Sequence, residues 1–387
     1  MSRSMSRLCS VSLVVLCGAL IVAGLMVARL ADPDLLFRPA AAFAAGSAVP
    51  SGRIRFAVLG DSDSQSYHDA LMLRDPGERG GPWRATTWQW TEVLARLRGD
   101  QIDFGKWGAW GTGKYRAYAD EALGFLARMP PKDDYRYNFA VSGATCNQLM
   151  GHPLRETIRL VDLMDTDPQA WRGGIVLIRI GVNDVSDEVI DELSRDRNAS
   201  HPNAVIDACI AEIGASVALI REHHPDTDVV LVGVLSRADG SDVRRWQSAQ
   251  AMANIDTGLD RFDNGLRKLA AGDRHVYFLD DRAWLRSLWG GRDAQGRPSY
   301  KTVHLSPGWA ITNTTGDDPH NAGLSDGHAG VVWNTLWAQN LVTVLNTAFG
   351  LHLKPITDAE VIGFLRPSFT TTSARPALRL PTALSKN

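Results

Sequence analysis

Three short polar segments follow apolar runs of the chain and contain the residue types that acyl transfer requires. Ser62 ends a Gly-Asp-Ser segment, Gly143 lies in a Ser-Gly-Ala-Thr segment, and Asn183 lies in a Gly-Val-Asn-Asp segment. A serine hydroxyl can attack an acyl carbonyl, and fixed N–H donors can stabilise the oxyanion that forms. The backbone N–H groups of Ser62 and Gly143 and the side-chain amide of Asn183 would supply three donors. These segments predict a nucleophilic serine beside an oxyanion hole.

A serine nucleophile needs a base, and the C-terminal part of the chain offers two candidates. His328 follows Asp326 by two residues and directly precedes an apolar helical pattern. On such a loop the carboxylate can bind one imidazole nitrogen while the other nitrogen faces Ser62. His320 follows Asp317 by three residues and is the alternative base pair.

Five short apolar runs are predicted to position these residues. The runs lack the alternation of half-exposed strands, and this pattern is typical of buried parallel strands. They cover residues 54–59, 137–141, 175–180, 229–234 and 276–279. Because ligands bind beyond the carboxyl ends of parallel strands, the segments that follow the first three runs are expected to meet in one crevice.

Helical patterns alternate with these runs, at residues 87–98, 204–222, 247–271 and 331–346. Alternating strands and helices predict a doubly wound α/β fold. We therefore expect a parallel sheet of about five strands with helices on both faces, in three α/β/α layers.

Together the motif segments resemble those of the SGNH (GDSL-like) hydrolase family. The match extends from residue 54 to about residue 347. It includes the GDS segment at Ser62, the isolated Gly143, the GxND segment with Asn183, and an Asp-His block before the last helix. Four such blocks in the family's order are far more specific than a single GDS segment.

The resemblance implies a flavodoxin-like sheet and a Ser-His-Asp hydrolase that needs no metal or other cofactor. Its substrates would be esters such as O-acetyl sugars, acyl lipids or thioesters. The family often places its His three residues after its Asp, as in Asp317 and His320. Its base also directly precedes the final helix, however, and on this ground we expect Asp326 and His328 to act.

The leading prediction is an exported serine esterase that hydrolyses carbohydrate or lipid acyl esters through an acyl-serine intermediate. An acyltransferase that passes the same acyl group to a glycan is an alternative, because both reactions share the covalent step. An inactive carbohydrate-binding protein on the same scaffold is another alternative, since a fold does not determine a function. The presence of Ser62, Asn183 and His328 argues against this last alternative.

The N-terminus predicts export. After two arginines, residues 8–28 carry no charge and are long enough to span a bilayer as a helix. Residues 1–31 are therefore expected to be a membrane anchor or a signal peptide, with a small-residue cleavage pattern at residues 42–44. The expected location is periplasmic or extracellular, with membrane contact only through this segment.

Residues 32–52 read as an Ala/Pro-rich linker, residues 53–350 as the hydrolase domain and residues 351–387 as a loosely attached C-terminal extension. The chain has 41 basic and 43 acidic residues without long runs of one sign, which does not favour a nucleic-acid partner. A small-molecule or glycan ester fits this charge balance better.

Cysteines and tryptophans leave two questions open. Cys146 and Cys209 follow the leader and can pair in an oxidising compartment, and their surroundings show no Cys/His spacing of a zinc site. Five tryptophans between residues 83 and 110 form either ordinary core packing or a wall for sugar stacking or acyl contact.

Overall fold

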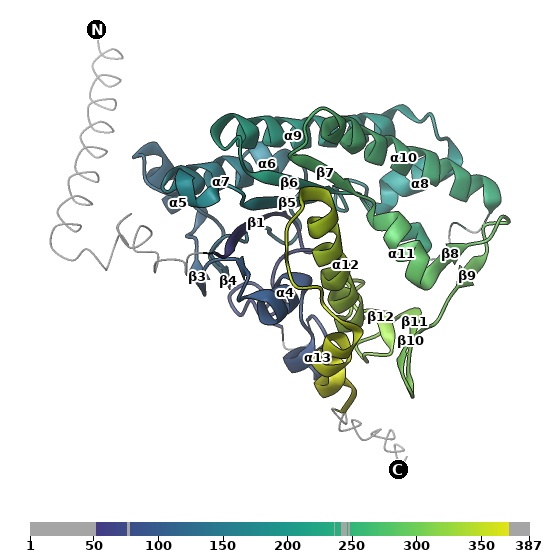
Figure 1. Cartoon of the computed structure of the whole chain (residues 1–387). Helices are drawn as coiled ribbons and strands as arrows, with labels where there is room; N and C mark the ends of the chain where they lie inside the picture. Colours follow the sequence, from purple (N-terminus) through teal and green to yellow (C-terminus); the bar gives the residue numbers. More distant parts are fainter. Residues whose placement is uncertain (1–51, 76–77, 236, 241–245, 247, 371–387) are drawn as a thin grey trace, which may run out of the picture.

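A five-stranded parallel sheet organises the computed structural model, which describes residues 52–75, 78–235, 237–240, 246 and 248–370. Across the sheet, the strands are β2 (Ile102–Asp103), β1 (Ile54–Gly60), β5 (Ile175–Arg179), β6 (Asp228–Val232) and β7 (Val276–Leu279). All neighbouring pairs are parallel. The sheet has the flavodoxin-like strand order. With helices on both faces (Figure 1), this order confirms the predicted three-layer α/β/α fold.

One face of the sheet is covered by helices from the middle of the chain. These helices are α6 (Asn147–Met150), α7 (Glu156–Asp165), α8 (Asp187–Arg195), α9 (Ser200–His223) and α10 (Ala249–Ala271). Alternate strand side chains, among them Leu59 and Ile178, are buried in this layer. The predicted helices at 204–222 and 247–271 correspond to α9 and α10, and those predicted at 87–98 and 331–346 correspond to α4 (Trp90–Arg98) and α12 (Val331–Phe349).

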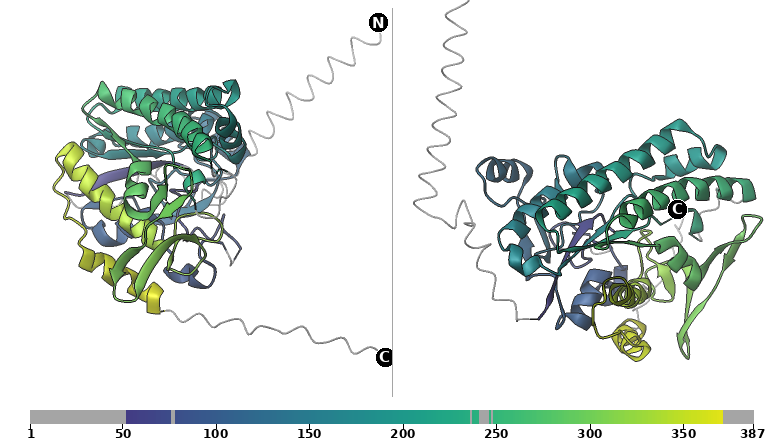
Figure 2. Two further views of the ribbon diagram at one scale, coloured as in Figure 1. Left: turned by 90° about the vertical axis from the view of Figure 1, so that its right-hand side faces the viewer. Right: turned by 45° about the horizontal axis from the view of Figure 1, so that its top comes forward.

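The opposite face is covered by helices from the two ends of the described chain. These helices are α4 (Trp90–Arg98), α11 (Asp281–Trp289), α12 (Val331–Phe349) and α13 (Asp358–Thr370). Phe56 and Val58 of β1 face this layer, where Trp90 packs against Trp337. Figure 2 shows α12 and α13 on the other side of the sheet from α9 and α10. Both faces of the sheet are therefore buried, as the unbroken apolar runs indicated.

The predicted strand at residues 137–141 is replaced by an extended segment beside β1. The segment shares backbone hydrogen bonds with β1, including Val58 N to Tyr137 O at 3.0 Å and Phe139 N to Val58 O at 2.8 Å. These two bonds form an isolated β-bridge between Val58 and Asn138 rather than a paired strand. The next donor of β1, Gly60 N, binds Glu156 Oε2 at 2.9 Å instead of this segment, and β2 pairs with the start of β1. Competition from side chains thus shortens this edge of the sheet.

Smaller elements surround the sheet. The antiparallel pairs are β3 (Trp107–Trp110) with β4 (Lys132–Tyr135), and β8 (Gly290–Arg292) with β9 (Pro298–Tyr300). A third small sheet contains β10 (Val303–Ser306), β11 (Trp309–Thr315) and β12 (Asn321–Gly323). The remaining helices are α5 (Lys114–Ala122) and the short 3-10 segments η1 (Gly81–Thr86), η2 (Pro168–Trp171) and η3 (Arg237–Asp239).

The C-terminal segment is packed against the domain up to residue 370, so the expected loose attachment does not hold there. Leu353, Ile356, Val361 and Leu365 are buried beside α12. The buried Arg98 side chain donates to backbone carbonyls of this segment and binds Glu360 at 3.1 Å. The sequence did not predict this packing, because Leu353 and Ile356 lie in an irregular stretch that has no helical or strand periodicity. Residues 371–387 lie outside the described part.

Helix α9 is apolar and long enough to cross a membrane by length and composition, and it alone passes this test among the described residues. Its Ile206, Ile213 and Ile220 side chains are buried against the sheet, as in a core helix. The predicted anchor or signal peptide at residues 1–31 lies outside the described residues.

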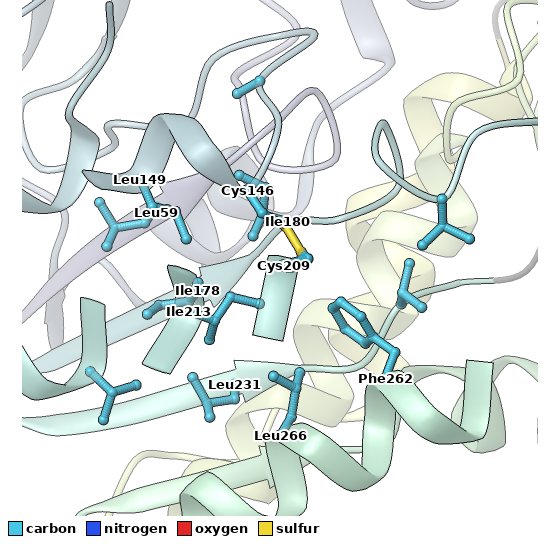
Figure 3. Packing of buried hydrophobic residues seen from close by; sticks show 14 of the residues in the cluster. Leu59, Cys146, Leu149, Ile178, Ile180, Cys209, Ile213, Leu231, Phe262 and Leu266 are labelled. Atoms are coloured by element: carbon cyan, nitrogen blue, oxygen red, sulfur yellow. A yellow bond between two sulfur atoms is a disulfide. The ribbon is translucent and has the colours of Figure 1, made fainter. Parts of the chain in front are cut away.

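Cys146 and Cys209 form a disulfide that joins the start of α6 to α9, with their Cα atoms 5.0 Å apart. Figure 3 shows the bond among buried side chains that include Leu149, Ile180 and Phe262. Cys146 follows Gly143 by three residues. The disulfide therefore anchors a candidate oxyanion loop to the helical layer.

Candidate active site

A cavity of about 510 Å³ lies where the loops after β1, β5 and β12 meet. Ser62, Gly143, Asn183, Asp326 and His328 all contribute to its wall. These are the five residues that the sequence analysis assigned to the nucleophile, the oxyanion hole and the base pair. The cavity lies beyond the carboxyl ends of the parallel strands, where such folds bind ligands.

The nucleophile loop is a tight turn at the end of β1. A Cβ atom at Gly60 would lie 2.1 Å from the Arg179 carbonyl oxygen, so only glycine permits this close approach of β1 and β5. The Asp61 carboxylate accepts from Asp63 N at 2.9 Å, and Arg179 donates to the Asp63 carbonyl at 3.2 Å. These bonds hold Ser62 in the cavity wall with only 7% of its surface exposed.

The Asp61 carboxyl, next to the nucleophile in the chain, is buried, and burial disfavours its ionised form. Burial raises its pKa well above the ordinary value, and the nearby charge of Asp63 raises it further. Asp61 Oδ2 has no hydrogen-bond partner among the described residues.

Gly143 presents its backbone toward open space beside the nucleophile loop. Its φ of +79° lies in the left-handed region, and nothing lies within 4 Å of where a Cβ atom would be. Two bonds tie the segment to the nucleophile loop: Val141 N donates to the Gly60 carbonyl at 2.9 Å, and Ser142 N donates to Gln65 Oε1 at 2.6 Å. Gly143 therefore forms part of the cavity wall without a side chain that would cover its backbone.

Asn183 connects the loop after β5 to the Gly143 segment. Its side-chain Nδ2 donates to the Ala144 carbonyl at 2.8 Å, and the amide has a second hydrogen. The adjacent Asp184 accepts from Cys146 N at 2.9 Å, and burial raises its pKa. Asp184 thus supports the loop, and the bond to Ala144 uses one of the two hydrogens of the Asn183 amide.

His328 and Asp326 lie on a tight turn between β12 and α12. Asp326 Oδ1 is 3.1 Å from His328 Nδ1 and accepts from the His328 backbone N–H at 3.1 Å. Leu324 N donates to the His328 carbonyl at 2.7 Å, which closes the turn. Burial alone would raise the pKa of Asp326, but the hydrogen bond and charge of His328 and the charge of Arg79 hold it well below its usual range. The carboxylate therefore stays ionised beside the imidazole.

Arg79 is a site residue that the sequence analysis missed. Its Nη1 donates to Asp326 Oδ2 at 2.5 Å and contacts His328 Nδ1, while Nη2 lies 3.4 Å from Ser142 Oγ. Arg79 belongs to the long segment between β1 and β2, far from the motif blocks. The only local signal is the pair of glycines that follows it, and such pairs are common in turns.

The alternative base pair lies outside the cavity wall. His320 is about half exposed, and its Nδ1 is 2.6 Å from Asp318 Oδ1 rather than from Asp317. Asp317 accepts instead from the Ser325 hydroxyl at 2.8 Å and from its backbone N–H at 3.2 Å. Asp317 therefore braces the turn that contains His328.

The rest of the cavity wall combines hydrogen-bonding and apolar groups. The polar side chains include Asn313, Thr314 and Thr315 of β11, and the apolar ones include Leu235, Leu285 and Trp333. The tryptophans between residues 83 and 110 do not belong to this wall, and Trp90 is fully buried. For these residues, the packing alternative fits better than a substrate-binding wall.

The one group of described residues with spacing for a metal ion is Cys146, Asp184 and Cys209. The two sulfur atoms are joined in the disulfide, so this group lacks two thiolate ligands. Its geometry is that of a covalent crosslink beside a supporting carboxylate.

The strand order and the placement of the motif blocks match the SGNH (GDSL-like) hydrolase fold that the sequence resembles. Solved structures similar to the chain include a family 3 carbohydrate esterase from Clostridium thermocellum, at 14% sequence identity and a TM-score of 0.37, over 77% of this chain and 98% of that chain. An extracellular lipase from Streptomyces rimosus is similar at 17% identity and a TM-score of 0.32, over 63% of this chain and 86% of that chain.

A protein from Parabacteroides merdae, provisionally described as a GDSL-like lipase, is similar at 16% identity and a TM-score of 0.36, over 77% of this chain and 96% of that chain. No protein-family model and no curated protein matches the sequence. Because these identities and TM-scores are low, we assign chemistry from the chain's own residues.

Proposed function

We propose that the protein is an exported serine esterase that hydrolyses acyl esters of carbohydrates or lipids through an acyl-serine intermediate. The observation that carries this proposal is the convergence of Ser62, Gly143, Asn183 and the Asp326–His328 pair on one cavity. Export rests on the apolar N-terminal segment of the sequence. The charge balance supports a small-molecule or glycan ester as substrate rather than a nucleic acid.

The reaction would proceed in two acyl-transfer steps. His328 takes the Ser62 hydroxyl proton as the oxygen attacks the ester carbonyl, and Asp326 stabilises the imidazolium that forms. N–H groups of Ser62, Gly143 and Asn183 would bind the oxyanion. Collapse of the intermediate expels the alcohol, which takes the proton from His328, and leaves the acyl group on Ser62. Water, activated in the same way by His328, then releases the acid.

The cavity supports a polar alcohol group with an acyl chain of limited size. Its volume of about 510 Å³ falls within the range of small-molecule sites. Asn313 and Thr314 would bind hydroxyl groups, and Leu285 with Trp333 would contact apolar atoms. Acyl transfer to a glycan hydroxyl, the alternative drawn from the sequence, shares the acyl-serine and differs in the acceptor.

Labelling with a fluorophosphonate, together with p-nitrophenyl acetate hydrolysis, tests the proposal. The wild-type chain should react at Ser62, and Ser62→Ala should lose labelling and several orders of magnitude in turnover, because the covalent route is gone. Ser142→Ala is the matched control, since it removes another hydroxyl from the same cavity and should retain labelling. Labelling that persists in Ser62→Ala would exclude Ser62 as nucleophile, and an unlabelled wild-type chain would favour the inactive binding protein.

The substrate is then identified with a panel of acetylated glycans and acyl esters of increasing chain length. Release of free acid identifies hydrolysis, whereas appearance of an acylated glycan when an acceptor is added identifies the transferase. Preference for short acyl chains is the expected result from the cavity volume.

A further inference from the structure

The guanidinium of Arg79 reaches the candidate base, His328, from a position 249 residues away in the sequence. Its side chain is only 7% exposed, and it also lies over the Tyr67 ring at 5.3 Å. Tyr67 in turn donates from its hydroxyl to the Ala329 carbonyl at 3.0 Å, next to His328. Arg79 is thus enclosed by the residues that surround the Asp326–His328 pair.

The backbone at Arg79 is held in an uncommon conformation. Arg79, Gly80 and Gly81 have φ values of 56°, 110° and 46°, all in the region that side chains disfavour. A Cβ atom at Gly81 would lie 2.6 Å from Asp317 Oδ2, and Asp317 is the residue that braces Ser325. Such conformations persist only where many surrounding contacts hold the backbone in place. The loop of Arg79 and the turn of His328 are therefore packed as one unit.

Arg79 completes the binding of the Asp326 carboxylate. Oδ1 is occupied within its own turn, by the His328 backbone N–H and Nδ1, and Oδ2 is bound by Arg79. With only one residue between Asp326 and His328, this turn holds the carboxylate from one side. The Arg79 guanidinium holds it from the other side and leaves little freedom of rotation.

Arg79 also places a fixed positive charge beside the imidazole. Asp326 favours the protonated imidazole, whereas a cation in contact with Nδ1 disfavours it. The other charged or titratable groups that line the cavity or contact Arg79 are Asp63, Asp187, Asp239, Arg179 and Tyr67. Among the described residues, Asp326 and Arg79 are opposite charges that contact the His328 ring directly.

We propose that Arg79 is a positioning residue that fixes Asp326 and sets the pH range in which His328 acts as a base. This inference rests on the proposed hydrolase function. Arg79 acts through the Asp-His pair and takes no part in bond formation. Without its charge, His328 would hold a proton to higher pH, and the neutral imidazole that accepts the serine proton would be less abundant near neutrality.

The test compares kcat/KM for p-nitrophenyl acetate and the rate of fluorophosphonate labelling across pH in the wild type, Arg79→Gln and Arg79→Lys. Arg79→Gln keeps a hydrogen-bond donor but loses the charge. The acid limb of both profiles, which is the pH range over which the rate first rises, should therefore move to higher pH by about one unit. Arg79→Lys keeps the charge, so its limb should stay near that of the wild type even if the maximal rate falls.

Arg98→Gln is the matched control, because Arg98 is also a buried arginine paired with a carboxylate, but it lies at the end of α4 and binds Glu360 of α13. Its acid limb should not move. A uniform loss of rate in Arg79→Gln with no shift of the limb would show that Arg79 is merely structural and would overturn the proposal. A shift in Arg79→Lys as large as that in Arg79→Gln would also overturn it.

Asp326→Asn provides a second test that does not need a folded Arg79→Gln variant. Here the Arg79 cation is no longer balanced, so the acid limb of residual labelling should fall below the ordinary histidine value of about 6.5. A limb at or above that value would contradict the proposal. Failure of the hydrolase function is recognised separately, as an unlabelled Ser62 in the wild type.

Discussion

Removal of the Asn183 side-chain amide tests the oxyanion hole most directly. Asn183 Nδ2 donates one hydrogen to the Ala144 carbonyl at 2.8 Å, and the cavity wall includes this residue. Asn183→Ala therefore removes two interactions with separable consequences. One stabilises the loop in the resting protein, and the other would form only when the ester carbonyl becomes an oxyanion.

The two losses differ in size and in the quantity they change. Loss of one preorganised oxyanion donor costs about 10²- to 10³-fold in kcat, or roughly 3–4 kcal/mol of transition-state stabilisation. Loss of the bond to the Ala144 carbonyl costs about 1 kcal/mol of folding stability, because Asn183 is only partly buried. We therefore expect a large fall in kcat, a small change in KM and a melting temperature lowered by only a few degrees.

The assay measures kcat and KM for p-nitrophenyl acetate alongside thermal unfolding. Asn254→Ala is the matched control, because Asn254 is a buried asparagine on α10 that donates to the Ser194 carbonyl at 3.1 Å. The control should lose similar stability and keep its kcat. An unchanged kcat in Asn183→Ala, or an equal fall in both variants, would refute the assignment of Asn183 as an oxyanion donor.

Three further predictions follow from the site and the core. His328→Ala should abolish turnover and labelling of the serine, whereas His320→Ala should retain both, and the reverse outcome would transfer the base role to His320. Replacing Cys146 and Cys209 by alanine should lower the free energy of unfolding by roughly 4 kcal/mol, as denaturant titration of the double variant against the oxidised wild type would show, because the disulfide closes a loop of 63 residues. Burial raises the pKa of Glu156 in the folded protein well above its pKa in the unfolded chain. The folded protein therefore gains stability from the protonated Glu156 side chain below about pH 4, and it loses this stability as pH rises through the pKa of the folded state. Glu156→Gln should therefore melt higher than the wild type at alkaline pH but not at acid pH, and an equal difference at both would contradict this reasoning.

The strands of the central sheet could be predicted where a short run of apolar residues indicates that both faces of the strand are buried. The runs at 54–59, 175–180, 229–234 and 276–279 contain apolar residues without alternation, because both sides of each strand are covered. The observed strands match these runs within two residues at each end. The run at 137–141 contains Asn138 among its apolar residues, and its pairing with β1 ends where Gly60 N donates to the distant Glu156 carboxyl group instead.

The candidate site also has some features that the sequence predicts and others that only the tertiary structure determines. The sequence by itself determined the chemical types at the ends of the strands: a serine after β1, a glycine after residues 137–141, an asparagine after β5, and an Asp-His block before α12. It did so because parallel strands bring their carboxyl ends to one edge, so order along the chain predicts proximity in the fold.

Only the tertiary structure decided which histidine enters the cavity and which groups hold it. Asp317 binds Ser325 rather than His320, the disulfide joins Cys146 to Cys209, and Arg79 reaches Asp326 across 247 residues. These contacts form between side chains on loops whose paths depend on packing, and no local pattern or periodicity encodes them. The sequence can therefore specify the reactive groups, but their orientation and charge balance arise only when distant segments pack together.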